Sequence, residues 1–296
     1  MKKGFTLIEL AIVLVIIGLL IGVGVSLLPG LIAQQKYTQN QSLINQNYNT
    51  LIGYIMANGK LPMASSNTNG TASNQNIGYL PYTTIGGLQK DAYGNTFYYA
   101  LNTRTLNISI NGANPTSMNL ANTSSIQNFC AVLYALNYYY AQNPTLSSSD
   151  VRTINAPNAT PIMDAFVIIS SGANNKLDSP NTITNSNGVF ASQQYPLSNT
   201  YDDSVMALSI TDAIGKFCSG SPNTQFNVGY SNGTYQLYSL ANINNSSNNT
   251  GNNNPGNSAY GQCISNCNQN FWCYLQAIIS YGSCNQACKS NPNFCQ

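Results

Sequence analysis

The chain has 296 residues and a net charge of +2, and only 6% of its residues are charged. It contains no histidine, which removes the usual general base and the commonest metal ligand, so the composition disfavours an enzymatic site. Apart from the adjacent Lys2 and Lys3, its lysines and arginines are scattered along the chain. Because phosphate binding needs clustered basic residues, the sequence gives no indication of nucleic-acid binding.

A short basic N-terminus leads into a long apolar run. Lys2 and Lys3 come first, residues 10–28 are almost entirely apolar, and Pro29 ends the run. As a helix, this run is long enough to cross a hydrocarbon core of about 30 Å. We therefore predict a single-pass membrane helix whose N-terminal lysines lie in the cytoplasm.

Glu9 is the single glutamate of the chain, and it borders the apolar run. A carboxylate is costly in such a helix unless it is paired, so the sequence predicts a partner for Glu9. Two alternatives for this segment are a secretory signal peptide, cleaved among the small residues 22–26, and a plain signal anchor. Neither alternative explains why a glutamate stands at this position.

Residues 3–10, KGFTLIEL, resemble the leader motif of the type IV pilins and the type II secretion pseudopilins. The resemblance implies that a membrane-embedded prepilin peptidase cleaves after Gly4, so that residues 1–4 form the leader. It implies that Phe5 becomes the new, N-methylated terminus. It also implies that Glu9 meets the Phe5 ammonium group of a neighbouring subunit when the filament assembles.

A long helix is predicted over residues 5–58, with a length of roughly 75–80 Å. Its first half is the apolar run, and its second half is expected to pack under a globular head. In that second half the apolar residues recur at the spacing of one helical face. This face comprises Ile44, Tyr48, Leu51, Ile52 and Ile55. Gly59 suits a left-handed cap at the end of the helix.

Residues 60–241 are predicted to form the globular head. Strand-like runs rich in β-branched and aromatic residues occur at 96–101, 106–110, 165–169 and 205–210. One helix is expected over residues 125–142, and a short one is expected after an N-cap at Thr211 and Asp212. The predicted fold class is α+β, in which the long N-terminal helix packs on an antiparallel sheet and a small C-terminal disulfide-rich helical module follows.

The loop before the first predicted strand has the sequence of a turn. Residues 91–99 resemble the aspartate–aromatic–Gly–Asn turn through which the pseudopilin chain enters its sheet. The usual proline after the aspartate is Ala92 in this chain, so the match is partial. We expect this turn to begin at Asp91.

A second part of the head resembles the strand and loop that carry calcium in some pseudopilins. The resemblance rests on residues 165–175 and on the later pair Asp202 and Asp203. It implies a Ca²⁺ site in which Asp178, Asp202 and Asp203 supply carboxylates and residues 172–176 supply backbone carbonyls. The alternative is that these are ordinary turn residues, because Asn and Asp are common in turns.

The eight cysteines predict disulfides, because a head that lies across the membrane from cytoplasmic lysines is outside the reducing cytoplasm. Cys130 and Cys218 stand alone in the head and are expected to pair with each other. For the remaining six, one of fifteen possible connectivities is favoured by the i, i+4 spacing of two pairs. It joins Cys263 to Cys288, Cys267 to Cys284 and Cys273 to Cys295. A zinc site is the alternative, which the lack of histidine weakens.

An Asn-rich run, residues 242–257, has the composition of a flexible polar linker. It separates the head from the cysteine-rich module at residues 258–296. That module is too small for a large apolar core, so we expect its cross-links to hold it together.

The sequence favours a structural subunit of an extracellular type IV pilus, as a main or a minor pilin. The second hypothesis is a type II secretion pseudopilin that forms a periplasmic piston, and the third is a membrane-anchored extracytoplasmic enzyme. The expected partners are other copies or other pilins, prepilin peptidase and the inner-membrane assembly platform. We expect the chain in the inner membrane before assembly, and in an extracellular filament or the periplasm afterwards.

Overall fold

The computed structural model describes residues 6–143, 147–182 and 188–242, and for residues 23–27 it describes the backbone alone. The chain divides into two compact units. The first unit comprises Met1–Leu106 and Ser117–Phe217, and the second comprises Asn107–Thr116 and Cys218–Gln296.

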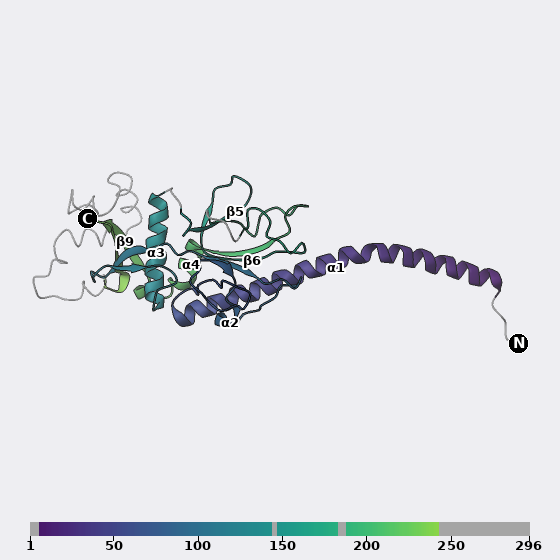
Figure 1. Ribbon diagram of the computed structural model, residues 1–296, viewed down its shortest axis with the longest axis horizontal. Helices are drawn as coiled ribbons and strands as arrows, with labels where there is room; N and C mark the ends of the chain where they lie inside the picture. The colour runs from purple at the N-terminus through teal and green to yellow at the C-terminus, as the bar shows by residue number, and fades with distance from the viewer. Residues whose placement is uncertain (1–5, 144–146, 183–187, 243–296) are drawn as a thin grey trace, which may run out of the picture. The chain divides into compact units, whose positions relative to one another are not determined.

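The first unit begins with helix α1, which spans Leu7–Asn58 and is roughly 78 Å long at 52 residues (Figure 1). As the sequence predicts, Gly59 ends the helix in the left-handed conformation, with a φ of 62°. Its N–H donates to the Ile55 carbonyl at 2.7 Å. A Cβ atom on Gly59 would lie 2.4 Å from the Ser125 backbone, so a larger residue does not fit there.

The predicted membrane crossing by residues 10–28 is not confirmed. Within the described part of the chain, no helix is both long enough and apolar enough to qualify as a membrane span. The side chains of residues 23–27, which belong to the predicted run, lie outside that part.

The second half of α1 buries a stripe that differs from the predicted one. Its fully buried residues are Asn40, Ile44, Asn47, Leu51 and Ile55, whereas the predicted members Tyr48 and Ile52 are only half-buried. Two amides therefore occupy buried positions on this helix. The Asn47 side chain accepts from the Leu88 N–H at 2.7 Å and donates to the Leu88 carbonyl at 3.1 Å, so its burial is compensated.

The larger sheet has the strand order β1-β2-β6-β5-β7, with β8 paired to the other edge of β6. Its strands are β1 (Ile77–Tyr79), β2 (Tyr98–Leu101), β5 (Val151–Ile154), β6 (Ile162–Ser170), β7 (Val189–Ala191) and β8 (Ser204–Ser209). All pairs are antiparallel except β5 with β7. The sheet is therefore mixed and not purely antiparallel as predicted. Strand β7 lies beside β5 at the end of the strand order, and it runs in the same direction as β5.

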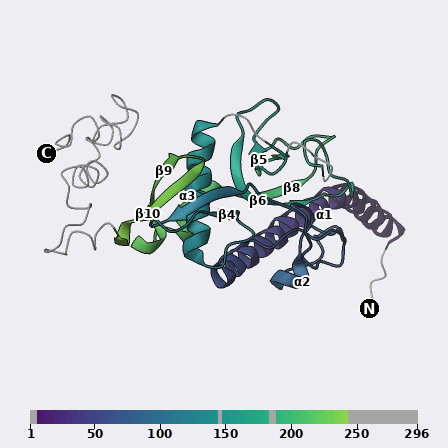
Figure 2. The same cartoon turned by 60° about the vertical axis from the view of Figure 1, so that its left-hand side comes forward.

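Helix α1 lies along β6 and β8 on one face of this sheet (Figure 2). The Tyr48 ring packs against Phe166 of β6 with ring centroids 5.6 Å apart. Because successive strand residues point to opposite faces, Val167 and Ile169 face the other side. They join a second buried cluster with Ala100, Val151, Phe190, Ala191, Tyr201 and Val205.

The described residues of the first unit also form the helices α2 (Tyr82–Ile85), α3 (Ile126–Gln142) and α4 (Ile210–Phe217). Helix α3 matches the predicted helix, and Ser125 caps it by accepting from the Asn128 N–H at 3.2 Å. Helix α4 is capped by Ser209, whose hydroxyl accepts from the Asp212 N–H at 3.0 Å. The predicted cap at Thr211 and Asp212 was therefore too late in the chain.

The second unit contains most of a smaller sheet of order β4-β3-β10-β9. The strands of this sheet are β3 (Leu106–Ile110), β4 (Thr116–Met118), β9 (Phe226–Ser231) and β10 (Thr234–Ser239), and the 3₁₀ helix η1 (Pro222–Thr224) precedes β9. Strands β9 and β10 form a hairpin through Asn232 and Gly233, both with positive φ. Asn-Gly favours such a turn, so this hairpin was predictable and was missed. Strands β10 and β3 are parallel.

Both described cysteines, Cys130 and Cys218, are disulfide-bonded. Their pairing with each other stays a prediction. The other six cysteines, the linker from residue 243 onward and the module at 258–296 lie outside the described residues, so their predicted connectivity and helices are not tested.

Candidate functional site

The start of α1 is a capping box built from Thr6 and Glu9. The Thr6 N–H and the Thr6 hydroxyl both donate to Glu9 Oε2, at 2.9 and 3.0 Å. The Glu9 N–H lies 3.4 Å from the Thr6 hydroxyl oxygen, to which it donates. The box provides partners for N–H groups that the start of a helix otherwise leaves unpaired. The Thr-x-x-Glu spacing carries this signal, and the prediction of an intermolecular partner for Glu9 overlooked it.

The apolar side chains around and after Glu9 are exposed. From Leu7 to Ile21, the large apolar residues are between 45% and 88% exposed. Apolar surface of this extent marks contact with another protein or with lipid. In a single copy of the chain, the apolar surface of the first half of α1 is therefore not covered by protein or lipid.

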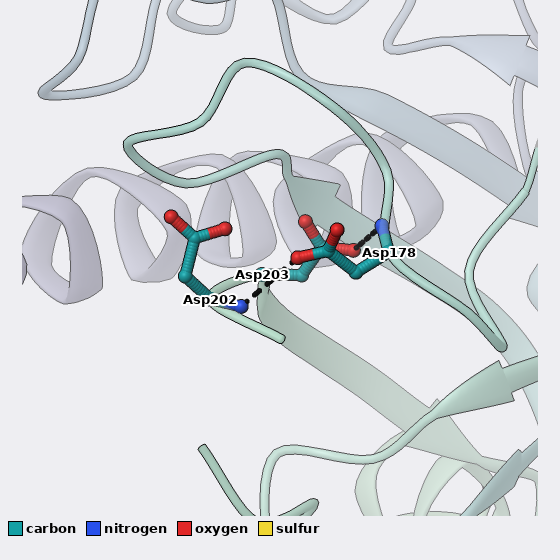
Figure 3. Close-up of side chains that lie close together, drawn as sticks. All are labelled: Asp178, Asp202 and Asp203. Atoms are coloured by element: carbon teal, nitrogen blue, oxygen red, sulfur yellow. Dashed lines mark hydrogen bonds between the residues drawn. The ribbon is translucent and has the colours of Figure 1, made fainter. Parts of the chain in front are cut away.

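Three aspartates of the first unit lie together at one end of its sheet (Figure 3). Asp178 follows β6, and Asp202 and Asp203 directly precede β8, the strand paired with β6. Each offers one carboxylate oxygen, and these oxygens lie within 4.8 Å of one another. In Figure 3 the Asp178 and Asp203 carboxylates are neighbours, whereas that of Asp202 points away from them in this view.

Backbone and amide donors hold these carboxylates in place. Asp203 Oδ2 accepts from the Asp178 N–H and from the Asn181 side-chain amide, both at 2.9 Å. Asp178 Oδ2 accepts from the Asp202 N–H at 3.0 Å. Asp202 Oδ2 accepts from the N–H groups of residues 173 and 174, at 2.8 and 3.1 Å. The Asn174 side-chain amide also donates to both carboxylate oxygens of Asp178, at 3.2 and 3.1 Å. These contacts hold the three side chains in place.

Burial perturbs two of these aspartates. Asp203 is 3% exposed, and burial raises its pKa to about 7, despite hydrogen bonds from Asn181 and the Asp178 N–H that lower it. Burial also raises the pKa of Asp202, against the hydrogen bonds from residues 174 and 173. The Oδ1 atoms of Asp202 and Asp203 are buried and have no hydrogen-bond partner among the described residues. Such oxygens are costly unless something pairs with them.

This arrangement fits a hard divalent cation. Ca²⁺ takes six to eight oxygens from carboxylates and carbonyls, and it would pair with the two unpartnered Oδ1 atoms. Of the carbonyls expected from residues 172–176, that of Gly172 already accepts from the Asn95 side-chain amide at 2.9 Å. The structure brings the three aspartates together, and the cation itself stays a prediction.

Comparison with known families gives one match, at the N-terminus. Residues 1–25 match the family model of the prokaryotic N-terminal methylation motif. The chain carries a prepilin-type motif. This is the cleavage and methylation motif of the type IV pilins and pseudopilins. Searches of the curated proteins and of the solved structures found no match.

The prepilin-type motif supports a structural protein that is like a type IV pilin or a pseudopilin. It implies membrane insertion, processing by prepilin peptidase and assembly into pilin-type filaments. Gly4 and Phe5, the residues at the expected cleavage and methylation point, lie outside the described residues. Glu9 is described, and its contacts with Thr6 are those of the capping box.

Proposed function

We propose that this protein is a structural subunit of an extracellular type IV pilus, as a main or a minor pilin. The prepilin-type motif at residues 1–25 is the observation that carries this proposal. The exposed apolar first half of α1 supports it, because packing in a filament would bury that surface. The precursor inserts in the inner membrane, is cleaved by prepilin peptidase and enters the filament through the assembly platform.

In the filament, Glu9 pairs with the N-methylated ammonium group of Phe5 from a neighbouring subunit. Within one chain, both hydrogen bonds that Glu9 accepts end on Oε2, which leaves Oε1 for a second partner. A charge in apolar surroundings is costly unless it is paired. Assembly would therefore neutralise Glu9 where the folding of a single chain does not.

A type II secretion pseudopilin, acting in a periplasmic piston, is the second candidate. The clustered aspartates and the turn at Asp91 favour it, because both resemble pseudopilin features. Asp91 Oδ1 accepts from the Tyr93 N–H at 2.9 Å and from the Asn95 N–H at 2.8 Å. The turn therefore forms with Ala92 in place of the usual proline.

In either filament, Asp178, Asp202 and Asp203 would hold Ca²⁺. The support for this site is the buried Asp203 side chain, whose Oδ1 has no hydrogen-bond partner among the described residues. Bound Ca²⁺ would hold the loop after β6 against the start of β8. Its role would be structural.

Two variants separate the charge of Glu9 from its capping bond. Glu9→Gln keeps a side chain that accepts from the Thr6 N–H but removes the charge. Thr6→Val removes the hydroxyl contacts and keeps the charge. We expect Glu9→Gln to be processed normally and to lose surface fibres, whereas Thr6→Val keeps them. Electron microscopy of whole cells shows the fibres, and the mass of the chain reports processing.

Fibres that persist in Glu9→Gln would contradict the assembly role of this carboxylate. A wild type without surface fibres, combined with a failure to secrete exported enzymes when the protein is deleted, would favour the pseudopilin.

A further inference from the structure

Loop residues 172–174, beside the aspartates, are tied to the turn at Asp91. The Asn95 side-chain amide donates to the Gly172 carbonyl at 2.9 Å. The Asn95 N–H donates to Asp91 Oδ1 at 2.8 Å. Asn95 therefore links the loop that surrounds Asp202 to the carboxylate of Asp91.

The same turn is tied to helix α1 through buried polar groups. The Ser170 hydroxyl donates to Asp91 Oδ2 at 2.6 Å. The Asn40 side-chain amide donates to that hydroxyl at 3.0 Å, and Asn40 Oδ1 accepts from the Ala92 N–H at 3.4 Å. Asn40, Asp91 and Ser170 are each no more than 5% exposed. Buried polar chains of this kind hold their members in fixed positions, because every lost bond leaves a buried group unpaired.

A second and shorter connection reaches the next residue of the helix. Gln41 donates through its side-chain amide to the Ser204 hydroxyl at 3.2 Å. Ser204 directly follows Asp203 in the chain. The start of β8 is thus bonded directly to Gln41. The loop after β6 is linked to Asn40 indirectly, through the contacts of Asn95, Asp91 and Ser170.

The aspartate loop has little room to move independently of these contacts. Gly172 has a φ of +66°, and a Cβ atom there would lie 2.6 Å from the Asp202 carboxylate. Asp202 therefore lies directly against Gly172, whose carbonyl accepts from the Asn95 side-chain amide.

Asn40 is the first buried residue of α1 in the described part of the chain. The exposed half of the helix precedes it. Whatever fixes Asn40 and Gln41 therefore determines where α1 leaves the rest of its unit.

We propose that Asn95 and Asp91 are positioning residues that couple the aspartate cluster to α1, so that a divalent cation at Asp178, Asp202 and Asp203 tightens the docking of α1 at Asn40 and Gln41. This coupling rests on the proposed cation site. Cation occupancy then sets how firmly the helix is held at its exit point, while the contacts of Leu51 and Ile55 further along the helix are unaffected.

Hydrogen exchange of the full-length protein in detergent micelles tests the coupling. Exchange is followed in α1 peptides with CaCl₂, with MgCl₂ and with a chelator, and titration calorimetry measures Ca²⁺ binding in parallel. The test variant is Asn95→Ala, which removes the bond to the Gly172 carbonyl and leaves the aspartates intact. The matched control is Asn49→Ala, because Asn49 is an exposed α1 residue whose side-chain amide donates to Asn45 of the same helix.

We expect Ca²⁺ to slow exchange around residues 40–44 at least threefold in the wild type and in Asn49→Ala, with no change around residues 51–55. Asn95→Ala should still bind Ca²⁺, with an affinity within about threefold of wild type, and lose most of that protection, because only the contact of Gln41 with Ser204 remains. Calcium binding that leaves residues 40–44 unchanged, or full protection in Asn95→Ala, would overturn the coupling alone. A chain that binds no Ca²⁺ would overturn the cation site and the coupling together, while the assembly role of Glu9 would stand.

Discussion

Asn40 of α1 donates through its side-chain amide to the Ser170 hydroxyl at 3.0 Å, although 130 positions separate the two residues. Both side chains are fully buried, and the Ser170 hydroxyl in turn donates to Asp91. The helix is therefore held to the sheet by a polar contact as well as by its apolar stripe. Because a buried amide bonds well in only one arrangement, this contact also fixes the register of α1 on the sheet.

Replacing this amide should cost stability. We expect Asn40→Leu to lower the free energy of unfolding by about 1–3 kcal/mol, because Ser170 loses a buried partner. Urea unfolding followed by near-ultraviolet circular dichroism measures the change. The control Asn49→Leu, on the exposed face, should stay within about 0.5 kcal/mol of wild type. Equal losses in both variants would mean that the contact adds nothing.

Asp164 on β6 predicts a pH dependence of stability. It is 1% exposed, and its Oδ2 has no hydrogen-bond partner within the described residues. Burial raises its pKa to about 8, although hydrogen bonds from Thr153 lower it. The folded state thus holds a proton that the unfolded state releases near pH 4, so stability falls as the pH rises from about 4 to about 8.

Asp164→Asn should remove this dependence. From pH 6 to pH 9 the variant should gain roughly 2–3 kcal/mol relative to wild type. Urea unfolding at the two pH values measures the difference. Asp203 adds the same pH dependence of stability to the variant and to the wild type, so it does not affect the comparison. Parallel pH profiles for variant and wild type would show that Asp164 is not the group responsible.

Two arginines near Asp150 differ in their hydrogen bonding. Arg104 binds Asp150 through Nε and Nη2, both at 2.6 Å, and the Asp150 side chain is fully buried. Although burial alone would raise the pKa of Asp150, the bonds from Arg104, the Ser147 N–H and Tyr140 hold it below its usual value. By contrast, Nε and Nη1 of Arg152 are buried without a hydrogen-bond partner among the residues described.

We expect Arg104→Met to lower the free energy of unfolding at pH 7 by about 3 kcal/mol, because it leaves a buried carboxylate uncompensated. Arg152→Met should be neutral or stabilising, since it removes a desolvated charge. The cost of Arg104→Met should shrink below pH 4, where Asp150 becomes protonated and the stability from its lowered pKa is lost. Thermal unfolding of the wild type and the two variants at pH 7 and pH 3 checks this. A larger loss of stability at pH 7 in Arg152→Met than in Arg104→Met would refute it.

Calcium affinity should rise with pH. Ca²⁺ binds the ionised carboxylate, and burial raises the pKa of Asp203 to about 7. Between pH 6 and pH 8 we therefore expect the affinity to increase about tenfold. Titration calorimetry at both values measures it, with Asp203→Asn as the control that should lose the pH dependence together with most of the binding. A constant affinity would exclude Asp203 as a ligand.

Local sequence signals predicted several elements well. The cap predicted at Gly59 is present, and the helix predicted over residues 125–142 is present as α3. Both signals are confined to neighbouring residues in the chain. The hairpin at Asn232 and Gly233 carries an equally local signal and was missed. By contrast, β7 is a strand of three residues, and no local sequence pattern encodes its parallel pairing with the distant strand β5.

Buried polar contacts were the least predictable part of the structure. The partners of Asn40 and Asn47 come from β6 and from loop residues 88–92, so the α1 sequence alone gives no sign that these amides are buried. The three aspartates predicted as ligands do lie together, while their binding of a cation stays a prediction. Their spacing in the chain does not reveal that the pairing of β6 with β8 brings them together.

Mass spectrometry of the intact mature protein, purified from membranes or from shed filaments, tests the central claim most directly. Cleavage after Gly4 predicts a chain that begins at Phe5 and carries one N-terminal methyl group. A chain that still begins at Met1, or one that begins near residues 22–26 after signal-peptide cleavage, would contradict the proposed pairing of Glu9 with a neighbouring terminus and the filament role built on it.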